Sequence, residues 1–179
     1  MIARAPDEPE FSRPIAAETI SNQIQRREVA AEPAECQALA RRFGLLSLDK
    51  LTATVELRRQ AGEVIHIGGH LLADVVQSCV VTLAPVPAHI ESDFELSYGG
   101  KAAEGEAGDM DPAGLDAPEP LVDGWIDLGE AVAQQLAIAL DPYPRAPGAS
   151  LGPEGFTAEA GKAAGKQPFA ALAALKKRP

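Results

Sequence analysis

The segment Leu51-Thr52-Ala53-Thr54-Val55-Glu56-Leu57 alternates apolar and polar residues one by one. Successive side chains of a β-strand point to opposite faces, so this pattern predicts a strand with one buried face. After an expected turn at Gln60-Ala61-Gly62, the odd-numbered positions continue the apolar series. The positions predicted to face the core are Ile65, Ile67, Leu71, Ala73, Val75, Cys79, Val81 and Leu83. Within this series, Gly68-Gly69 and Asp74 predict either a β-bulge or a break into two strands.

A further strand is expected after Pro85 and Pro87, where the apolar residues move to even-numbered positions. The same alternation rule applies to it, so its two faces can be assigned residue by residue. The residues predicted to face the core are Ile90, Phe94, Leu96 and Tyr98, and those predicted to face water are His89, Glu91, Asp93 and Glu95. A weaker strand is expected over residues 11–20.

Two helices are expected. Residues 32–43 allow Pro33 in the first turn and Gly44 as a left-handed cap, with Cys36, Leu39, Ala40 and Phe43 facing the core. A second helix is expected to begin at Asp127 as N-cap, with Glu130 three residues on in a capping-box arrangement, and to end before Pro142. Its apolar stripe is Leu128, Val132, Leu136 and Leu140. These elements predict an α+β fold, in which an antiparallel sheet of about five strands is packed by the two helices.

The expected domain organisation follows from composition. Residues 1–143 are predicted to form a single α+β domain, in which residues 99–120, rich in Gly, Ala, Pro and acidic residues, form a mobile acidic insertion. Residues 144–167 are expected to be a flexible linker. Residues 168–179 form a short segment with apolar Phe169, Leu172 and Leu175 and a basic end. We expect this segment to dock on a partner, although it could equally fold back on its own sheet.

The 179 residues carry a formal net charge of −10 that is unevenly spread. Residues 91–130 contain twelve Asp or Glu against a single lysine, Lys101. Such a block disfavours phosphate binding and suits either a basic partner or a solvated loop. The first fourteen residues lack the apolar centre of a secretory signal, and no apolar run approaches the ~20 residues of a membrane-spanning helix. With Cys36 and Cys79 as the only cysteines, a cytoplasmic location without a membrane partner is expected.

Candidate chemistry in the sequence is sparse. His66 and His70 are four residues apart, but on a strand this places their side chains about 13 Å apart, too far for one metal ion. Cys79 falls on the apolar side of its strand with no histidine near it in sequence, which favours a core cysteine over a nucleophile. No nucleophile elbow, phosphate-binding loop or dinucleotide fingerprint is present. We therefore expect no catalytic residue, no metal and no cofactor.

Nucleic-acid binding has a separate set of candidates. Arg26-Arg27, Arg41-Arg42 and Arg58-Arg59 are three basic pairs, and Lys176, Lys177 and Arg178 end the chain. They could meet RNA phosphates if the fold brought them to one face, and otherwise they are ordinary solvated charges. DNA is not an expected partner.

Three short segments carry a resemblance to a known family. They are Cys79-Val80-Val81-Thr82-Leu83-Ala84-Pro85-Val86, then Gly124-Trp125-Ile126-Asp127-Leu128, and lastly Gln167-Pro168-Phe169-Ala170-Ala171-Leu172. In this order and spacing they resemble the YceD family, the bacterial large ribosomal RNA subunit accumulation proteins. The family-motif positions are Cys79, Leu83, Pro85, Asp127, Leu128, Pro168, Phe169 and Leu172. The resemblance covers residues 62–177.

The chain also departs from the family pattern. Many relatives have Cys-x-x-Cys where this chain has Cys79 and Thr82, and some have further cysteines where it has Ala146-Pro147-Gly148-Ala149. The resemblance therefore implies no zinc site here.

The resemblance implies a non-enzymatic factor that supports accumulation of large-subunit (23S) rRNA and ribosome assembly. With the acidic segment, it suggests binding of a basic ribosomal protein or a pre-ribosomal particle through Glu91, Asp93 and Glu95, with Lys176, Lys177 and Arg178 as further contacts. The alternative is direct binding of rRNA through the arginine pairs and the basic tail. A hydrolase or nuclease with a dispersed site is a remote third possibility.

Overall fold

The computed structural model describes residues 9–60, 64–99, 118–121 and 123–150. The chain divides into two units, Met1–Ala146 and Pro147–Pro179, and all the helices and strands that follow belong to the first. Its elements are β1 (Pro14–Ala16), η1 (Ala17–Thr19), β2 (Gln25–Ala30), α1 (Pro33–Phe43), β3 (Ser47–Arg59), β4 (Val64–Ser78), β5 (Pro85–Gly99), β6 (Trp125–Asp127) and α2 (Leu128–Ala139).

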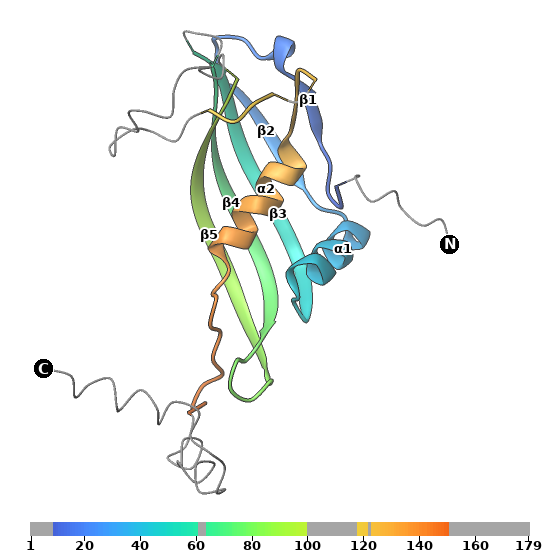
Figure 1. The fold of residues 1–179 in the computed structure, drawn as a ribbon, viewed down its shortest axis with the longest axis vertical. Helices are drawn as coiled ribbons and strands as arrows, with labels where there is room; N and C mark the ends of the chain where they lie inside the picture. The colour runs from blue at the N-terminus through green and yellow to red at the C-terminus, as the bar shows by residue number, and fades with distance from the viewer. Residues whose placement is uncertain (1–8, 61–63, 100–117, 122, 151–179) are drawn as a thin grey trace, which may run out of the picture. The chain divides into compact units, whose positions relative to one another are not determined.

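The strands form two antiparallel sheets. The larger has the order β2-β3-β4-β5, and the smaller pairs β1 with β6. Both helices lie on one face of the larger sheet (Figure 1). The α+β class is therefore confirmed, with the strands divided between a sheet of four and a ribbon of two.

The predicted alternation in β3 and β4 is confirmed. Leu51, Ala53, Val55 and Leu57 are buried, and so are Ile65, Ile67, Leu71, Ala73, Val75 and Cys79. Leu83 was wrongly placed in this series, since 76% of it is exposed. The chain leaves β4 after Ser78 and turns, and Leu83 adopts a left-handed φ of 61° in that turn. The alternation rule fails there because it holds only while the backbone stays extended.

The bulge or break predicted at Gly68-Gly69 is also wrong. β4 runs through both glycines with unbroken pairing to β5, and its pairing to β3 is unbroken there too. The register shift between β3 and β4 lies in β3 between Leu48 and Lys50, opposite Val75 and Asp74, so an irregularity is present beside Asp74 as predicted and absent at the two glycines. Gly69 stands directly opposite Phe94, whose ring occupies the space that a Cβ on Gly69 would fill. The glycine makes room for the ring and does not interrupt the strand.

On β5, Phe94 is buried and Ile90, Leu96 and Tyr98 pack against the core, while His89, Glu91, Asp93 and Glu95 are exposed. The predicted faces of this strand are therefore confirmed. The strand expected over residues 11–20 is shorter, since only Pro14–Ala16 is extended and η1 follows. β2 was missed because a single residue of its six, Val29, is buried, as suits an edge strand rich in charge.

The helix ends agree with the sequence. α1 has Pro33 at its first position and ends at Gly44 with φ 66°, and Cys36, Leu39 and Ala40 are buried. Asp127 caps α2 by accepting from the N–H groups of Gly129 and Glu130. The Glu130 carboxylate pairs with Arg42 of α1, at 2.7 Å, and so ties the two helices together. The capping box predicted between Asp127 and Glu130 is wrong, because the Glu130 carboxylate accepts from Arg42 and Gln134 instead. A reciprocal capping box is formed at α1, between Glu32 and Glu35.

Candidate functional site

The outer face of β5 carries a row of three carboxylates, Glu91, Asp93 and Glu95, which we call the acidic strand face. Their side chains are 64%, 87% and 82% exposed, respectively. The strand carries no lysine or arginine. The sequence therefore placed these three residues correctly in water, and the structure adds that they project from one rigid strand.

The three histidines of the chain lie on this same outer face. His70 on β4 contacts Asp93 at 2.7 Å and Glu91 at 3.3 Å, and His66 lies 3.8 Å from Glu95. His89 contacts Asp74 at 2.7 Å. Within the part of the chain that the structure describes, no group of three or more His, Cys, Asp or Glu side chains is placed to hold a metal ion.

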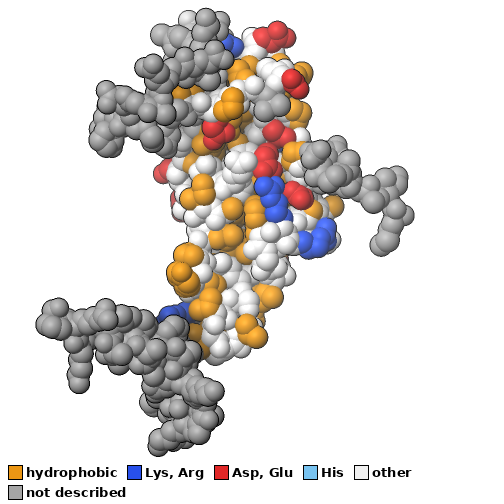
Figure 2. Space-filling model, in the orientation of Figure 1, with side chains coloured by type: hydrophobic (Ala, Val, Ile, Leu, Met, Phe, Trp, Pro, Cys, Tyr) orange, Lys and Arg blue, Asp and Glu red, His pale blue; other side chains and the backbone are white. Residues whose placement is uncertain are grey.

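A second acidic feature lies on the other side of the sheet, where β5 ends beside β6 and the start of α2. A cleft of about 420 Å³ is lined by Tyr98, Trp125 and the carboxylates of Glu119, Asp127 and Glu130, among others. Acidic side chains on this side of the molecule gather near the start of α2 (Figure 2). Burial, and then the neighbouring Glu119, raise the pKa of Tyr98 to about 12, so its phenol stays protonated. We call this the acidic cleft; no sequence pattern pointed to it.

Asp127, which lines the acidic cleft, fixes the neighbouring backbone through its carboxylate. Besides capping α2, its carboxylate accepts the Arg13 backbone N–H at 2.7 Å and the Ser12 hydroxyl. The following residue, Leu128, is buried and donates its N–H to the Arg13 carbonyl. These two family-motif residues thus join the N-terminal segment to α2 and serve the fold.

Cys79, the first family-motif residue, ends up enclosed by backbone N–H groups. Its buried Sγ accepts from Val81 and Thr82 at 3.4 Å each and from Ala146 at 3.3 Å. The Ala146 N–H, with the Thr82 hydroxyl and N–H as further donors, lowers the pKa of the Cys79 thiol to about 6. Leu83 and Pro85 shape the same turn, which ends where β5 begins. A sulfur atom this enclosed is a structural acceptor and is not accessible for attack on a substrate.

This geometry has a measurable consequence for pH. We expect one thiolate to form with a pKa near 6 in the folded protein, seen as absorbance at 240 nm and absent in Cys79→Ala. Since the folded pKa lies below the ordinary value of 9.0, the stability that these donors contribute is fully present above pH 9 and is lost as pH falls through 6. Cys36→Ala is the matched control, because burial raises the pKa of Cys36. Titration of both thiols above pH 9 would contradict the assignment.

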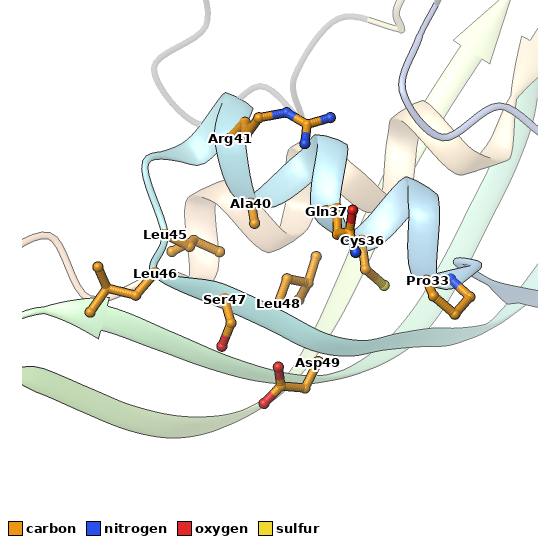
Figure 3. A pocket seen from close by; sticks show the side chains of 10 residues that line it. All are labelled: Pro33, Cys36, Gln37, Ala40, Arg41, Leu45, Leu46, Ser47, Leu48 and Asp49. Atoms are coloured by element: carbon orange, nitrogen blue, oxygen red, sulfur yellow. The ribbon is translucent and has the colours of Figure 1, made fainter.

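A cavity of about 560 Å³ lies between α1 and the start of β3 (Figure 3). Cys36 and Leu48 point toward each other in the space between α1 and β3, with Ala40 beside them, and the lining also includes Arg41 and Asp49, whose charged ends point away from this space. No histidine lines it, and the pKa of Cys36 is raised, so the thiol lacks both a base and the ionised form that a nucleophile needs.

The structure divides two of the three arginine pairs and engages one member of the third in ion pairs. The register of β2 with β3 puts Arg26 and Arg27 on opposite faces, and that of β3 with β4 does the same for Arg58 and Arg59. Arg42 donates to Glu10 and Glu130. The guanidinium of Arg59 donates to the carbonyls of Ile20 and Ala17. These pairs do not form one basic stripe.

The remaining candidates lie outside the described residues. They are Pro168, Phe169, Leu172, Lys176, Lys177 and Arg178, together with the greater part of the predicted insertion 99–120 and of the predicted linker 144–167.

Comparison with known proteins gives one match. A family model described as "Large ribosomal RNA subunit accumulation protein YceD" matches residues 67–176, more than half of the chain. No curated protein and no solved structure matches this chain. None of the described helices is long and apolar enough to cross a membrane.

Proposed function

The chain belongs to the YceD family, and from this membership we propose that it is a non-enzymatic factor that supports accumulation of large-subunit rRNA by binding a basic ribosomal protein or a pre-ribosomal particle. The family description supplies the link to large-subunit rRNA. We expect the protein to act in the cytoplasm, where ribosomal precursors are assembled.

The acidic strand face is the observation that carries the choice of partner. Three exposed carboxylates alternate along one strand that has no lysine or arginine, and histidines of β4 lie beside them. Electrostatic complementarity of this kind accelerates association with a basic partner and excludes acidic ones. Nucleic acid is the wrong partner for such a surface, since its phosphates would be repelled. The acidic cleft adds carboxylates and a half-exposed Trp125 on which an arginine could stack.

Two further observations support this proposal over its alternatives. Two of the three arginine pairs needed for direct rRNA binding are split between the faces of the sheet, and Arg42 of the third pair and Arg59 are engaged within the fold. For an enzyme, the described cysteines would be the natural nucleophiles, and both are buried.

The proposal is tested by recovering the tagged full chain from a lysate, with and without ribonuclease. Basic large-subunit proteins that remain after ribonuclease treatment would support it. Signal lost together with the RNA would favour direct rRNA binding. Recovery of neither would contradict both.

Removing the carboxylates of the acidic strand face tests whether this surface binds the partner. The variant Glu91→Gln/Asp93→Asn/Glu95→Gln is expected to weaken binding of the recovered ribosomal protein about tenfold at low salt, from three exposed ion pairs. The loss should shrink at physiological salt because exposed charges are screened. The matched control, Glu18→Gln/Glu28→Gln/Asp49→Asn, removes three other exposed carboxylates and should bind as the wild type does. Equal losses in both variants would mean that net charge matters and the acidic strand face does not.

Deletion of residues 168–179 addresses the C-terminal segment. Every residue of the described core precedes this segment, so the melting temperature is expected to stay unchanged. Association with ribosomal particles is expected to fall, because the deletion removes Phe169, Leu172 and the basic residues 176–178. A large fall in melting temperature would show instead that the segment stabilises its own domain.

A further inference from the structure

β5 is an edge strand of unusual length for an exposed position. It stands at one end of the order β2-β3-β4-β5, and its fifteen residues pair with β4 along their whole length (Figure 1). Among the described residues, its other side has one backbone partner, Glu119, which bridges to Tyr98 at the end of the strand. Unpaired edges of this kind are templates for another extended chain.

The bridge to Glu119 reveals which backbone groups point outward. Gly99 donates its N–H to the Glu119 carbonyl at 2.9 Å, and Glu119 donates its own N–H to the Ser97 carbonyl at 2.7 Å. In an antiparallel strand the N–H and C=O of one residue point to the same side, and this side alternates along the chain. The odd-numbered residues of β5 therefore direct their backbone groups to the free edge.

The two prolines of β5 agree with this assignment. Pro85 and Pro87 are both odd-numbered, so the N–H that each lacks would have pointed away from β4. They remove donors from the first part of the edge, and Glu119 occupies the last part. What remains is a window from His89 to Glu95. Within the part of the chain that the structure describes, the outward N–H and C=O groups of His89, Glu91, Asp93 and Glu95 have no backbone partner, although the Asp93 carbonyl accepts a bond of 3.4 Å from the Ser92 hydroxyl.

The same residues carry the acidic strand face. One strand added at this window would meet outward hydrogen-bonding groups at every second residue, about 7 Å apart, with a carboxylate at three of these four positions. A second copy of β5 would be a poor occupant, because its carboxylates would stand opposite like charges. Lysine or arginine at alternate positions of an extended segment satisfies both the backbone and the charges.

We propose that the free edge of β5 takes up an extended basic segment of the partner as a fifth strand of the sheet, with its cations facing Glu91, Asp93 and Glu95. This inference rests on the proposed function, because it names the site and the partner chemistry within it. The hydrogen bonds to His89–Glu95 give affinity in any sequence, and the alternating cations give selectivity.

The experiment uses the full chain and a nine-residue peptide with lysine at alternate positions and threonine between them. Amide hydrogen exchange is measured residue by residue with and without saturating peptide. Exchange of the amides of Glu91, Asp93 and Glu95 is expected to slow at least tenfold, because they gain acceptors. The amides of Ser92 and Phe94 face β4 and are expected to be slow already.

Matched peptides separate strand addition from simple charge attraction. A peptide with the same composition but consecutive lysines should bind at least fivefold more weakly. Two further peptides carry backbone N-methyl groups, one on the lysines and one on the threonines, with every charge retained. One of these two should lose binding at least tenfold, and which one does so reports whether the added strand is antiparallel or parallel.

The outcomes also distinguish this inference from the proposed function. Unchanged exchange at Glu91, Asp93 and Glu95 on peptide binding, or equal binding of both methylated peptides, would overturn the edge strand while leaving the basic partner in place. Failure of the peptide to bind a chain that does recover ribosomal proteins would overturn the inference in the same way. Recovery of no ribosomal protein would overturn the proposed function itself.

Discussion

Replacing Gly129 by alanine is expected to lower the free energy of unfolding by about 3 kcal/mol and the melting temperature by roughly 10 °C. A Cβ at this position would lie 2.5 Å from the carbonyl oxygen of Phe11 and 2.9 Å from its carbonyl carbon. These are backbone atoms held by the bonds of Asp127 and Leu128 to Arg13, so they cannot rotate aside. The N-terminal segment would have to move away from α2. Denaturant unfolding of the full chain measures the change.

The sign of this change discriminates between two explanations. Helix propensity alone would make alanine more favourable than glycine within α2, by up to about 1 kcal/mol. Ala137→Gly, at an exposed position of the same helix, measures that term separately and is expected to destabilise by no more than this amount. A stabilised Gly129→Ala protein would show that the close contact with Phe11 does not exist in solution.

Replacing Gly69 by alanine is expected to cost about 2–3 kcal/mol, whereas alanine at Gly68 is expected to cost nothing or to stabilise by up to about 1 kcal/mol. A Cβ on Gly69 would lie 2.1 Å from the Phe94 ring, and a Cβ on Gly68 would meet nothing within 4 Å. The two glycines are neighbours in β4 and differ in the face to which they point. Parallel denaturation of the two variants measures the difference.

A second substitution, at Phe94, tests whether its ring causes the stability loss expected for Gly69→Ala. In a Gly69→Ala/Phe94→Leu protein, the smaller side chain is expected to recover part of the loss, giving a coupling energy of about 1 kcal/mol between the two sites. Equal effects of alanine at Gly68 and Gly69 would contradict the packing of Phe94 over Gly69.

Much of the fold could be predicted because its patterns are local. The alternation of Leu51, Val55 and Leu57 follows from strand geometry, and the ends of α1 follow from Pro33 and Gly44. The exposed positions of Glu91, Asp93 and Glu95 follow from the same alternation in β5. Where burial was weak, as in β2 with Val29 alone, the pattern was too short to detect.

Other features required atoms from distant parts of the chain. The donors around Cys79 include the N–H of Ala146, and the acidic cleft joins the end of β5 to the start of α2. The role of Gly69 depends on Phe94 across the strand pair, so the glycine was mistaken for a bulge. The residues next to Cys79 and Gly69 in the sequence give no sign of their contacts with Ala146 and Phe94.

The amino-acid sequence by itself determined the α+β class, the buried and exposed faces of the long strands, the helix ends and the family. It could do so because periodicity and capping depend on residues a few positions apart. Only the tertiary structure decided that two of the three arginine pairs are divided, that Cys79 is enclosed, and that β5 lies at the sheet edge with its outward backbone groups and its carboxylates on the same residues. Strand order and cross-strand register bring together residues far apart in sequence, and the hydrophobic pattern of one strand does not specify its neighbours.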